Sequence, residues 1–433
     1  MTPAARLSAA IDIIETIEAD RAPAAKALKD WGTSHRFAGS GDRAAIAGLV
    51  WDVLRRRASS AWVMEDDSAR ARVLGMLKLE RGLDVPTIGA MCDGSRFAPP
   101  PLTDQEEKAL ASRTTEGAPS PVAGDYPDWL DPYLAAVFGD DRVAEAMAMA
   151  SRAPLDLRVN TLKAKREKVQ ASLKHLGAVP TPWSPIGLRI TLGADARNPG
   201  IHAEEDFIKG AIEVQDEGSQ LAALFTAAKP GEQVIDLCAG AGGKTLALAA
   251  MMGGKGRLIA TDDDKRQLAP IHERLSRAGV HNADVRSPKG DADPLADIRA
   301  SADLVVIDAP CTGTGTWRRN PDAKWRMRPG ALEIRLKDQA EVLDRAAGLV
   351  KPGGRIAYIT CSVLQPENGD QVRGFVARHP EFSIQPPDQT ATVLWDKAEA
   401  FAEAALKSDE GWLMTPRRTG TDGFFVSVLK KTG

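Results

Sequence analysis

The chain has 433 residues, which at about 100–200 residues per domain allows two to four domains with cores of their own. Its 56 basic and 59 acidic residues give a formal net charge of −3, which excludes a uniformly basic nucleic-acid coat and an acidic disordered tail. An anionic partner would therefore have to be met by a local basic patch. The four cysteines, Cys92, Cys238, Cys311 and Cys361, show no CxxC spacing, which argues against a zinc knuckle and a disulfide scaffold.

The first thirty residues and the hydropathy pattern bear on where the protein works. Acidic residues such as Asp12 and Glu15 interrupt the first apolar stretch, which a signal-peptide core would not tolerate. No apolar run approaches the ~20 residues that a membrane-spanning helix needs. The sequence therefore predicts a soluble, cytoplasmic protein without a membrane partner.

Residues 1–90 have the apolar spacing of helices, with Leu7, Ile11 and Ile14 at helical intervals and a second helical pattern at 46–54. The stretch FAGSGDR at 37–43, followed by that helix and three arginines at 55–57, resembles the small helical RNA-binding domain of the NusB type. The arginines either contact RNA or form a solvated helix end beside the negative pole of its dipole.

Residues 91–125 are predicted to form a linker. Three consecutive prolines at 99–101 and a Thr/Ser/Gly/Pro-rich run through Gly124 show neither helical nor strand periodicity. The following interval, 126–204, is predicted to be a small α/β module. Its expected elements are helices at 129–138 and 165–176 and strands at 155–162 and 188–192.

From residue 205 to 433 strand patterns alternate with helix patterns. The expected strands are 234–237, 257–261, 304–307 and 355–360, and the expected helices are 244–252, 265–278 and 331–350. This alternation predicts a parallel, doubly wound, Rossmann-like sheet in an α/β domain. Such sheets bind ligands at the carboxyl ends of their strands, so the residues that follow the strands are the candidate site.

The first of these strands runs into a glycine-rich turn. Its residues are Cys238, Ala239, Gly240, Ala241, Gly242, Gly243 and Lys244. Glycines at a helix start let backbone amides approach a ligand closely, although the spacing matches neither a phosphate loop nor a dinucleotide fingerprint. Lys244 could orient a ligand or a carboxylate, or could be an exposed first residue of its helix.

Carboxylates and thiols follow the other strands. Asp262 lies 20 residues after Gly242, where a doubly wound fold places the carboxylate that binds ribose hydroxyls. Together the turn and Asp262 predict an adenosine-containing cofactor, with Asp291 either near the adenine or in an ordinary loop. Asp308 with Cys311, and then Cys361, follow the last two strands, a placement that core packing does not explain.

These residues resemble an RNA (cytosine-5) methyltransferase of the Nop/Sun family. The resemblance runs from about residue 126 to the end, and with the helical region added it is similar to the bacterial branch that modifies 16S ribosomal RNA. The segments that carry it are PDWL at 127–130, LRVN at 157–160, QDEGS at 215–219, CAGAGGK at 238–244, DAPC at 308–311 and TCS at 360–362. Ala241 departs from the pattern, because many members have proline there.

The resemblance implies a class I methyltransferase that uses S-adenosylmethionine and transfers its methyl group to carbon 5 of a cytidine. It assigns Cys361 as the nucleophile that adds to carbon 6 and Cys311 to the later release step. It also places Asp308 against N3 of the base and Lys244 beside that carboxylate or the cofactor. The cofactor is expected to contact residues 238–244, Asp262, Asp291 and Asp308.

Residues 317–328, WRRNPDAKWRMR, are the local candidate for an RNA surface. The segment holds five basic residues and one acid, with two tryptophans between them. Cations suit phosphates, and aromatic faces suit splayed bases of single-stranded RNA. The expected partner is therefore RNA, with ribosomal RNA first, and the chain is expected to act as a monomer without a metal.

Other functions compete with this interpretation. Transfer RNA could be the cytosine-5 substrate, or the chain could be a non-catalytic RNA-binding assembly factor. A DNA cytosine-5 methyltransferase would use Cys311 as its nucleophile and leave Cys361 without a role. A nicotinamide-dependent oxidoreductase is disfavoured by the glycine spacing and by the lack of a hydride-transfer His/Tyr-Lys constellation.

Overall fold

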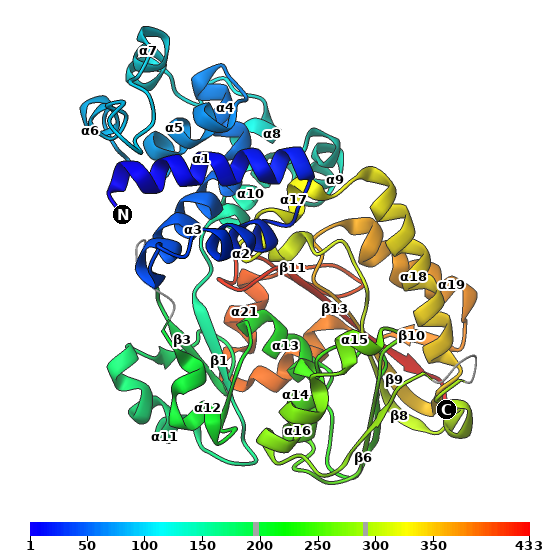
Figure 1. The fold of residues 1–433 in the computed structure, drawn as a ribbon. Coiled ribbons are helices and arrows are strands. Elements are labelled where there is room, and N and C mark those ends of the chain that lie inside the picture. The colour runs from blue at the N-terminus through cyan, green and yellow to red at the C-terminus, as the bar shows by residue number, and fades with distance from the viewer. Residues whose placement is uncertain (194–198, 289–292) are drawn as a thin grey trace. The chain divides into compact units, whose positions relative to one another are not determined.

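The structure is a computed structural model that describes residues 1–193, 199–288 and 293–433 (Figure 1). It divides into two compact units. The first, here the helical unit, contains Met1–Arg152 and Trp317–Arg328, and the second, the sheet unit, contains the other described residues. The domain boundary expected near residue 125 therefore differs from the spatial division, because residues 126–152 pack with the helices.

The helical unit is built on apolar faces that repeat at helical spacing. Leu7 and Ile14 of the first helix, Val50 of the third and Leu74 of the fifth are at most 1% exposed and belong to one core. Its helices are α1 Pro3–Asp20, α2 Ala24–Ser34, α3 Ser40–Arg55, α4 Arg57–Met64, α5 Ala69–Leu79, α6 Val85–Met91, α7 Asp104–Ser112, α8 Ser120–Ala123, α9 Asp131–Phe138, α10 Arg142–Ala150 and α17 Ala323–Arg326. No helix in the described ranges is long and apolar enough to cross a lipid bilayer.

The interval 91–125, expected to be a linker, contains α7 and α8. Thr103 and Glu106 form a reciprocal capping box at the start of α7, in which each side chain accepts from the other's backbone N–H. Ala109 and Leu110 of this helix are buried in the core of the helical unit. The capping pattern was visible in the sequence and outweighs the proline-rich composition that precedes it.

The sheet unit begins with a small antiparallel sheet. Its strands are β1 Leu155–Val159, β2 Val179–Pro180, β3 Gly187–Ile190 and β4 Ile212–Val214, in the order β2-β3-β1-β4, with α11 Arg166–Ser172 and α12 Glu205–Ile208 between them. Leu157, Val159, Leu188 and Ile212 fill its core with Val169 of α11. The expected small α/β module is present, and β4 adds a strand that the sequence pattern did not predict.

Within the described residues the large sheet has nine strands, and the five neighbouring strands from β9 to the β7 edge are parallel. The parallel strands are β5 Gln233–Asp236, β6 Arg257–Thr261, β7 Ala283–Arg286, β8 Ala302–Asp308 and β9 Val350–Thr360. Beyond β9 lie antiparallel strands: β10 Phe382–Ile384, β11 Leu406–Lys407, β12 Trp412–Met414 and β13 Phe424–Lys431. The doubly wound α/β fold is therefore confirmed, with an antiparallel extension that makes the sheet mixed.

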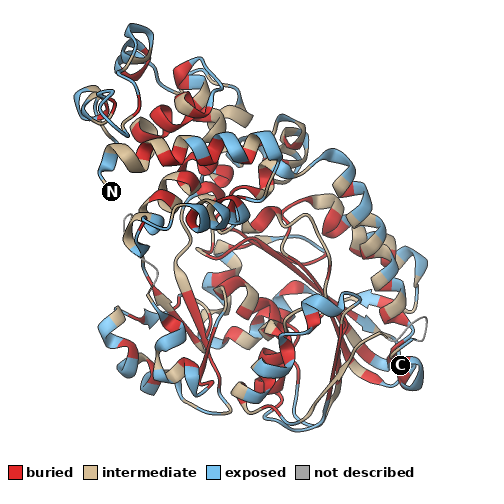
Figure 2. Ribbon diagram, viewed as in Figure 1, coloured by how far each residue is buried: buried red, intermediate tan, exposed pale blue. Residues whose placement is uncertain are grey.

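Helices cover both faces of this sheet (Figure 1). Val234 and Leu304 face a core shared with α13, α14 and α16, whereas by strand alternation Ile235 and Val305 face the side of α18. The helices are α13 Glu217–Phe225, α14 Gly243–Met251, α15 Lys265–Leu268, α16 Ile271–Ala278, α18 Pro329–Ala347, α19 Gly369–Arg378, α20 Pro387–Ala391 and α21 Ala398–Ala404. Figure 2 shows the central strands buried, while surrounding helices are buried on one side and exposed on the other.

Close packing of α4 on α5 leads to a stability prediction. A Cβ added at Gly75 would lie 2.6 Å from the Ser60 carbonyl oxygen, so Gly75→Ala must force the two helices apart. We expect it to lower the free energy of unfolding by about 1–3 kcal/mol. At Gly48 of α3 an added Cβ meets only ordinary contacts at 3.6 Å and beyond. Gly48→Ala should therefore be neutral or stabilise by up to about 1 kcal/mol.

Urea denaturation of the two variants and the parent protein checks this prediction. Equal destabilisation by both substitutions would contradict the close approach of α4 and α5, because helix propensity acts alike at both positions.

Candidate active site

The candidate site lies where the parallel strands of the sheet unit end. β5, β6 and β8 lie side by side in the same direction, so the segments that follow them meet at one edge of the sheet. There they enclose a cavity of about 680 Å³. Helix α18 closes the opposite wall with Arg335, Asp338, Glu341, Val342 and Arg345. Most of the residues predicted from the sequence line this cavity.

The glycine-rich turn between β5 and α14 forms one wall. Gly240 and Gly242 have φ values of +49° and +86°, and a Cβ on Gly242 would lie 2.5 Å from Cγ1 of Ile271, so only glycine fits there. Around Gly240 no heavy atom lies within 4 Å of an added Cβ, which leaves its backbone accessible to a ligand. Ala241, the position that departs from the family pattern, is held by a 2.7 Å hydrogen bond from Arg274 to its carbonyl oxygen.

Asp262 connects the second strand to this turn. Its Oδ2 accepts a 2.9 Å hydrogen bond from the Gly240 N–H, and its Oδ1 accepts one of 2.9 Å from the Asp264 N–H. The glycine-rich turn and Asp262, which the sequence analysis paired, are therefore in direct contact, through Gly240. Asp291 lies outside the described residues, so its expected contact with adenine stays a prediction.

Asp236, the last residue of β5, is a buried carboxyl that the sequence analysis did not select. Burial raises the pKa of Asp236 to about 7, although a 2.6 Å hydrogen bond from Thr245 opposes the shift. Its second oxygen is buried and accepts no hydrogen bond. Burial and the nearby carboxylates also raise the pKa of Cys238. Burial therefore shifts both groups toward their neutral forms, and Cys238 lines the cavity.

Lys244 and Asp308 form an ion pair between α14 and the end of β8. Lys244 Nζ lies 2.7 Å from Asp308 Oδ2 and 3.4 Å from Ser219 Oγ, and the lysine side chain is only 5% exposed. Lys244 is therefore not the exposed first residue of its helix. A buried ammonium that donates to a single carboxylate oxygen fixes the orientation of that carboxylate.

The two cysteines predicted to act together are brought together. Cys311 Sγ lies 3.4 Å from Cys361 Sγ as a thiol–thiol hydrogen bond, and both cysteines are free and partly exposed. The hydrogen bond with Cys361 and burial raise the pKa of Cys311 well above its usual value. Pro310, next to Cys311, lines the cavity, so the thiol pair lies beside it.

The sequence analysis missed the polar groups beneath these thiols. Glu367, Gln339, Thr312 and Ser362 form a buried hydrogen-bonded cluster that joins the ends of β8 and β9 to α18. No local pattern marks them, since they come from three separate segments. Ser362 was visible only as part of the TCS motif.

Residues 317–328, expected to bind RNA, belong instead to the helical unit. Trp317 and Lys324 are each 1% exposed, and the Trp325 indole donates a 2.7 Å hydrogen bond to the Leu54 carbonyl oxygen. For Trp317 and Lys324 the expectation was wrong, because they are buried among carbonyl and apolar partners inside the protein, whereas RNA contact by the exposed Arg326 and Arg328 stays a prediction. Composition alone cannot distinguish such a segment from an RNA surface.

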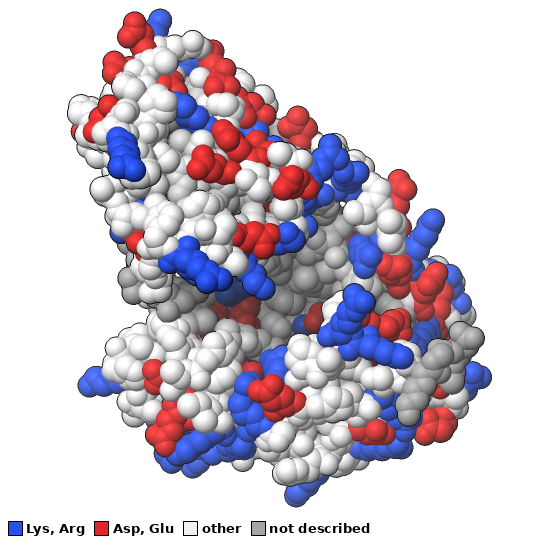
Figure 3. All heavy atoms as spheres, viewed as in Figure 1, with Lys and Arg blue, Asp and Glu red and all other residues white. Residues whose placement is uncertain are grey.

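The arginines at 55–57 are also held inside the helical unit. Arg55 is buried and donates to the carbonyl oxygens of Ala150 and Arg318 at 3.1 and 2.8 Å. Arg56 pairs with Glu80 at 2.7 Å, and Arg57 lies over the ring of Trp325. Neither alternative, RNA contact or solvated helix end, describes buried Arg55, whereas RNA contact by the partly exposed Arg56 and Arg57 stays a prediction. On the face shown in Figure 3, Lys and Arg side chains are interspersed with Asp and Glu.

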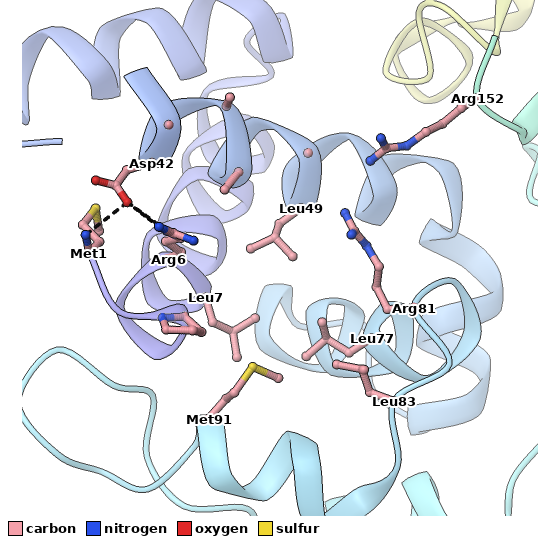
Figure 4. A pocket seen from close by; sticks show the side chains of 15 residues that line it. Met1, Arg6, Leu7, Asp42, Leu49, Leu77, Arg81, Leu83, Met91 and Arg152 are labelled. Atoms are coloured by element: carbon pink, nitrogen blue, oxygen red, sulfur yellow. Dashed lines mark hydrogen bonds and ion pairs between the residues drawn. The ribbon is translucent and has the colours of Figure 1, made fainter. Parts of the chain in front are cut away.

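A second cavity, of about 830 Å³, lies in the helical unit (Figure 4). Its apolar lining includes Leu7, Leu49, Leu77, Leu83 and Met91. Its charged groups are arginines in ion pairs, with Arg6 on Asp42 at 2.8 Å and both Arg81 and Arg152 on Asp52. The candidate catalytic residues are all in the sheet unit.

Buried Lys324 gives a pH-dependent prediction. Burial lowers its pKa from 10.5 to about 7, so between these values the unfolded chain binds more protons than the folded protein. The contribution of Lys324 to stability therefore rises with pH across that window. In Lys324→Met this rise is lost, which chemical denaturation of both proteins at several pH values will show. Exposed Lys29→Met is the control, and a parent-to-variant difference that is constant with pH would refute the assignment.

The fold and the strand-end residues together define a class I methyltransferase domain. The family model described as 16S rRNA methyltransferase RsmB/F matches residues 223–430, and the associated ferredoxin-like domain of RsmF/B-like proteins matches residues 126–197. The second match begins where the small α/β module was expected to begin.

Individual proteins agree with these matches. A probable ribosomal RNA small subunit methyltransferase B from Synechocystis is 32% identical over 342 residues, which are 76% of this chain and 70% of that protein. Ribosomal RNA small subunit methyltransferase B from Salmonella typhi is 33% identical over 71% of this chain and 66% of its own length. The crystal structure of PH0851 superposes with a TM-score of 0.74 at 27% identity, covering 100% of this chain and 99% of that one. The chain belongs to the RsmB/F branch of the Nop/Sun family of ribosomal RNA methyltransferases.

Proposed function

We propose that this chain transfers the methyl group of S-adenosylmethionine to carbon 5 of a cytidine in 16S ribosomal RNA, with Cys361 as the covalent nucleophile. The observation that carries the proposal is the pair of free thiols 3.4 Å apart, next to the Lys244–Asp308 ion pair. Membership of a family described by 16S rRNA methylation supports the substrate. The family resemblance supports the cytosine-5 chemistry.

The cavity at the strand ends fits S-adenosylmethionine. Its volume of about 680 Å³ lies within the usual range for sites of small ligands. The open space beside Gly240 leaves room for the ligand against the turn, Asp262 offers a carboxylate to ribose hydroxyls, and Asp308 lies at the end toward the thiols. When bound, the cofactor supplies an electrophilic methyl group.

The protein's own residues then act on the base. Carbon 5 of cytosine is a weak nucleophile until the Cys361 thiolate bonds to carbon 6, which moves electron density to carbon 5 and N3. Asp308, held through one oxygen by Lys244, acts here as an acid: it carries a proton on its other oxygen and gives that proton to N3 as the charge builds. After methylation a base takes the carbon-5 proton, the electrons of that carbon–hydrogen bond restore the 5,6 double bond, N3 returns its proton to Asp308, and Cys361 leaves as a thiolate. The family pattern assigns Cys311 to this release.

Reaching carbon 6 requires that the cytidine leave its stack. A base paired in a helix hides carbons 5 and 6, so the target nucleotide must be extruded or lie in a loop. Mass spectrometry of 16S and transfer RNA from cells with and without this protein tests the substrate. Loss of a single 5-methylcytidine from 16S RNA is the expected result. Loss from transfer RNA alone, or no loss, would overturn the proposal.

The cofactor placement predicts the effect of Asp262→Ala. The substitution removes the expected ribose contact and also the acceptor of the Gly240 N–H, so S-adenosylmethionine should bind more weakly by about 1–3 kcal/mol. Isothermal titration calorimetry measures this without any RNA. Asp409→Ala, at an exposed position of the sheet unit, is the matched control. Unchanged affinity in Asp262→Ala would place the ribose elsewhere.

Substituting the two cysteines one at a time should give opposite results. Cys361→Ala should abolish methyl transfer without trapping RNA, because only the attacking thiolate bonds to the base. Cys311→Ala should form the adduct, transfer the methyl group and stall, so that RNA stays attached during denaturing electrophoresis. Cys92→Ala, in the helical unit, serves as the control.

The rival DNA-type assignment reverses these phenotypes. A covalent RNA complex that persists in Cys361→Ala and vanishes in Cys311→Ala would therefore make Cys311 the nucleophile. Binding of RNA by all variants with no methylation by the parent protein would favour the non-catalytic assembly factor.

A further inference from the structure

Glu367 is a fully buried carboxylate in the turn that follows β9. Its Oε1 accepts hydrogen bonds from the Thr312 N–H at 2.8 Å and from Gln339 Nε2 at 3.0 Å. Its Oε2 accepts one of 2.5 Å from the Thr312 hydroxyl and another from the Ser362 hydroxyl. Glu367 is 0% exposed, so protein groups alone satisfy it.

The donors to Glu367 occupy equivalent positions in the two cysteine segments. Thr312 directly follows Cys311, and Ser362 directly follows Cys361. One carboxylate therefore holds both segments at the residue adjacent to each thiol. Gln339 extends the cluster, because its Nε2 also donates a 2.9 Å hydrogen bond to the Pro310 carbonyl oxygen.

Glu367 is itself held in place and lacks a cationic partner. The Tyr358 hydroxyl donates a 2.6 Å hydrogen bond to the Glu367 carbonyl oxygen. In the parts of the chain that the structure describes, Glu367 forms no ion pair, so hydroxyl, amide and backbone donors stabilise its carboxylate. Burying a carboxylate is expensive unless several donors satisfy it, and such arrangements concentrate at functional sites.

We propose that Glu367 is a positioning residue that fixes Cys311 and Cys361 against each other and against the target base. The inference rests on the function proposed above and adds a residue to it. The Glu367 carboxylate also acts electrostatically on Cys311. The hydrogen bond with Cys361 and burial are the largest causes of the raised pKa of Cys311, and the negative charge of Glu367 adds to them. Cys311 is thereby kept as a thiol that can donate its S–H to the Cys361 sulfur.

A kinetic experiment separates positioning from binding. Glu367→Gln keeps the size of the side chain but replaces one acceptor oxygen with a donor that faces other donors. We expect kcat to fall on the order of 100-fold, as for a misplaced reacting group. KM for RNA and the dissociation constant of S-adenosylmethionine should change by less than about two-fold. Exposed Glu403→Gln on α21 is the matched control, and Glu367→Asp, which restores the charge, should recover part of the loss.

A second readout does not depend on methyl transfer. Alkylation of Cys311 by iodoacetamide across a pH series, followed by mass spectrometry of the peptide that contains it, reports its ionisation. Removing a nearby negative charge favours the thiolate, so the midpoint should move to lower pH by about half a unit in Glu367→Gln. In Glu403→Gln it should stay at the parent value. This result stands even if the substrate proposed above is wrong.

Folding of each variant is checked by thermal unfolding. If Glu367→Gln does not fold, Thr312→Val and Ser362→Ala remove one donor each and leave the carboxylate in place. Each should lower kcat with KM retained. A folded Glu367→Gln with parental kcat and a parental Cys311 midpoint, or folded donor variants with parental kcat, would overturn the proposal.

Discussion

Parallel pairing of β8 with β5 on one side and β9 on the other is the constraint on which the site depends. In this register Val306 lies opposite both Asp236 and Ala357, and Asp308 lies opposite Ile359. The loops after these strands therefore begin at nearly the same height on the sheet. Lys244 then reaches Asp308, and the short side chains of Cys311 and Cys361 reach each other. A shift of one residue would turn the side chains of β8 to the opposite faces.

The residues that the sequence analysis placed correctly are those that chain topology brings together. Strand and helix periods identified the ends of β5, β6, β8 and β9, and parallel sheets collect such ends at one edge. This was sufficient to place the glycine turn beside Asp262 and to place Cys311 beside Cys361. Glu367 could not be found in the same way. Its donors Thr312 and Gln339 are 55 and 28 positions away, and no short-range pattern marks a buried carboxylate.

The wrong expectations concern residues whose surroundings decide their role. Lys324 and Trp317 have the composition of an RNA contact, yet the helical unit supplies acceptors such as the Arg55 carbonyl oxygen for the lysine. The proline-rich interval 91–125 likewise looked like a linker until its helix α7 was seen to bury Leu110. In both cases the residues that bury these side chains lie far away in the sequence. Local composition therefore predicted exposed side chains where the folded chain buries them.

The assignment of Trp317–Arg328 to the helical unit has a consequence for biosynthesis. Trp325 packs against the core formed by α1 to α7, and Lys324 and Trp325 bond to carbonyl oxygens at the end of α3. The ribosome makes this segment about 176 residues after Arg152. At a translation rate of about 5–20 residues per second, synthesis of these residues takes roughly 10–35 seconds. Until then the core of the helical unit is incomplete. During that interval the surface that will cover Trp325 is exposed on the nascent chain.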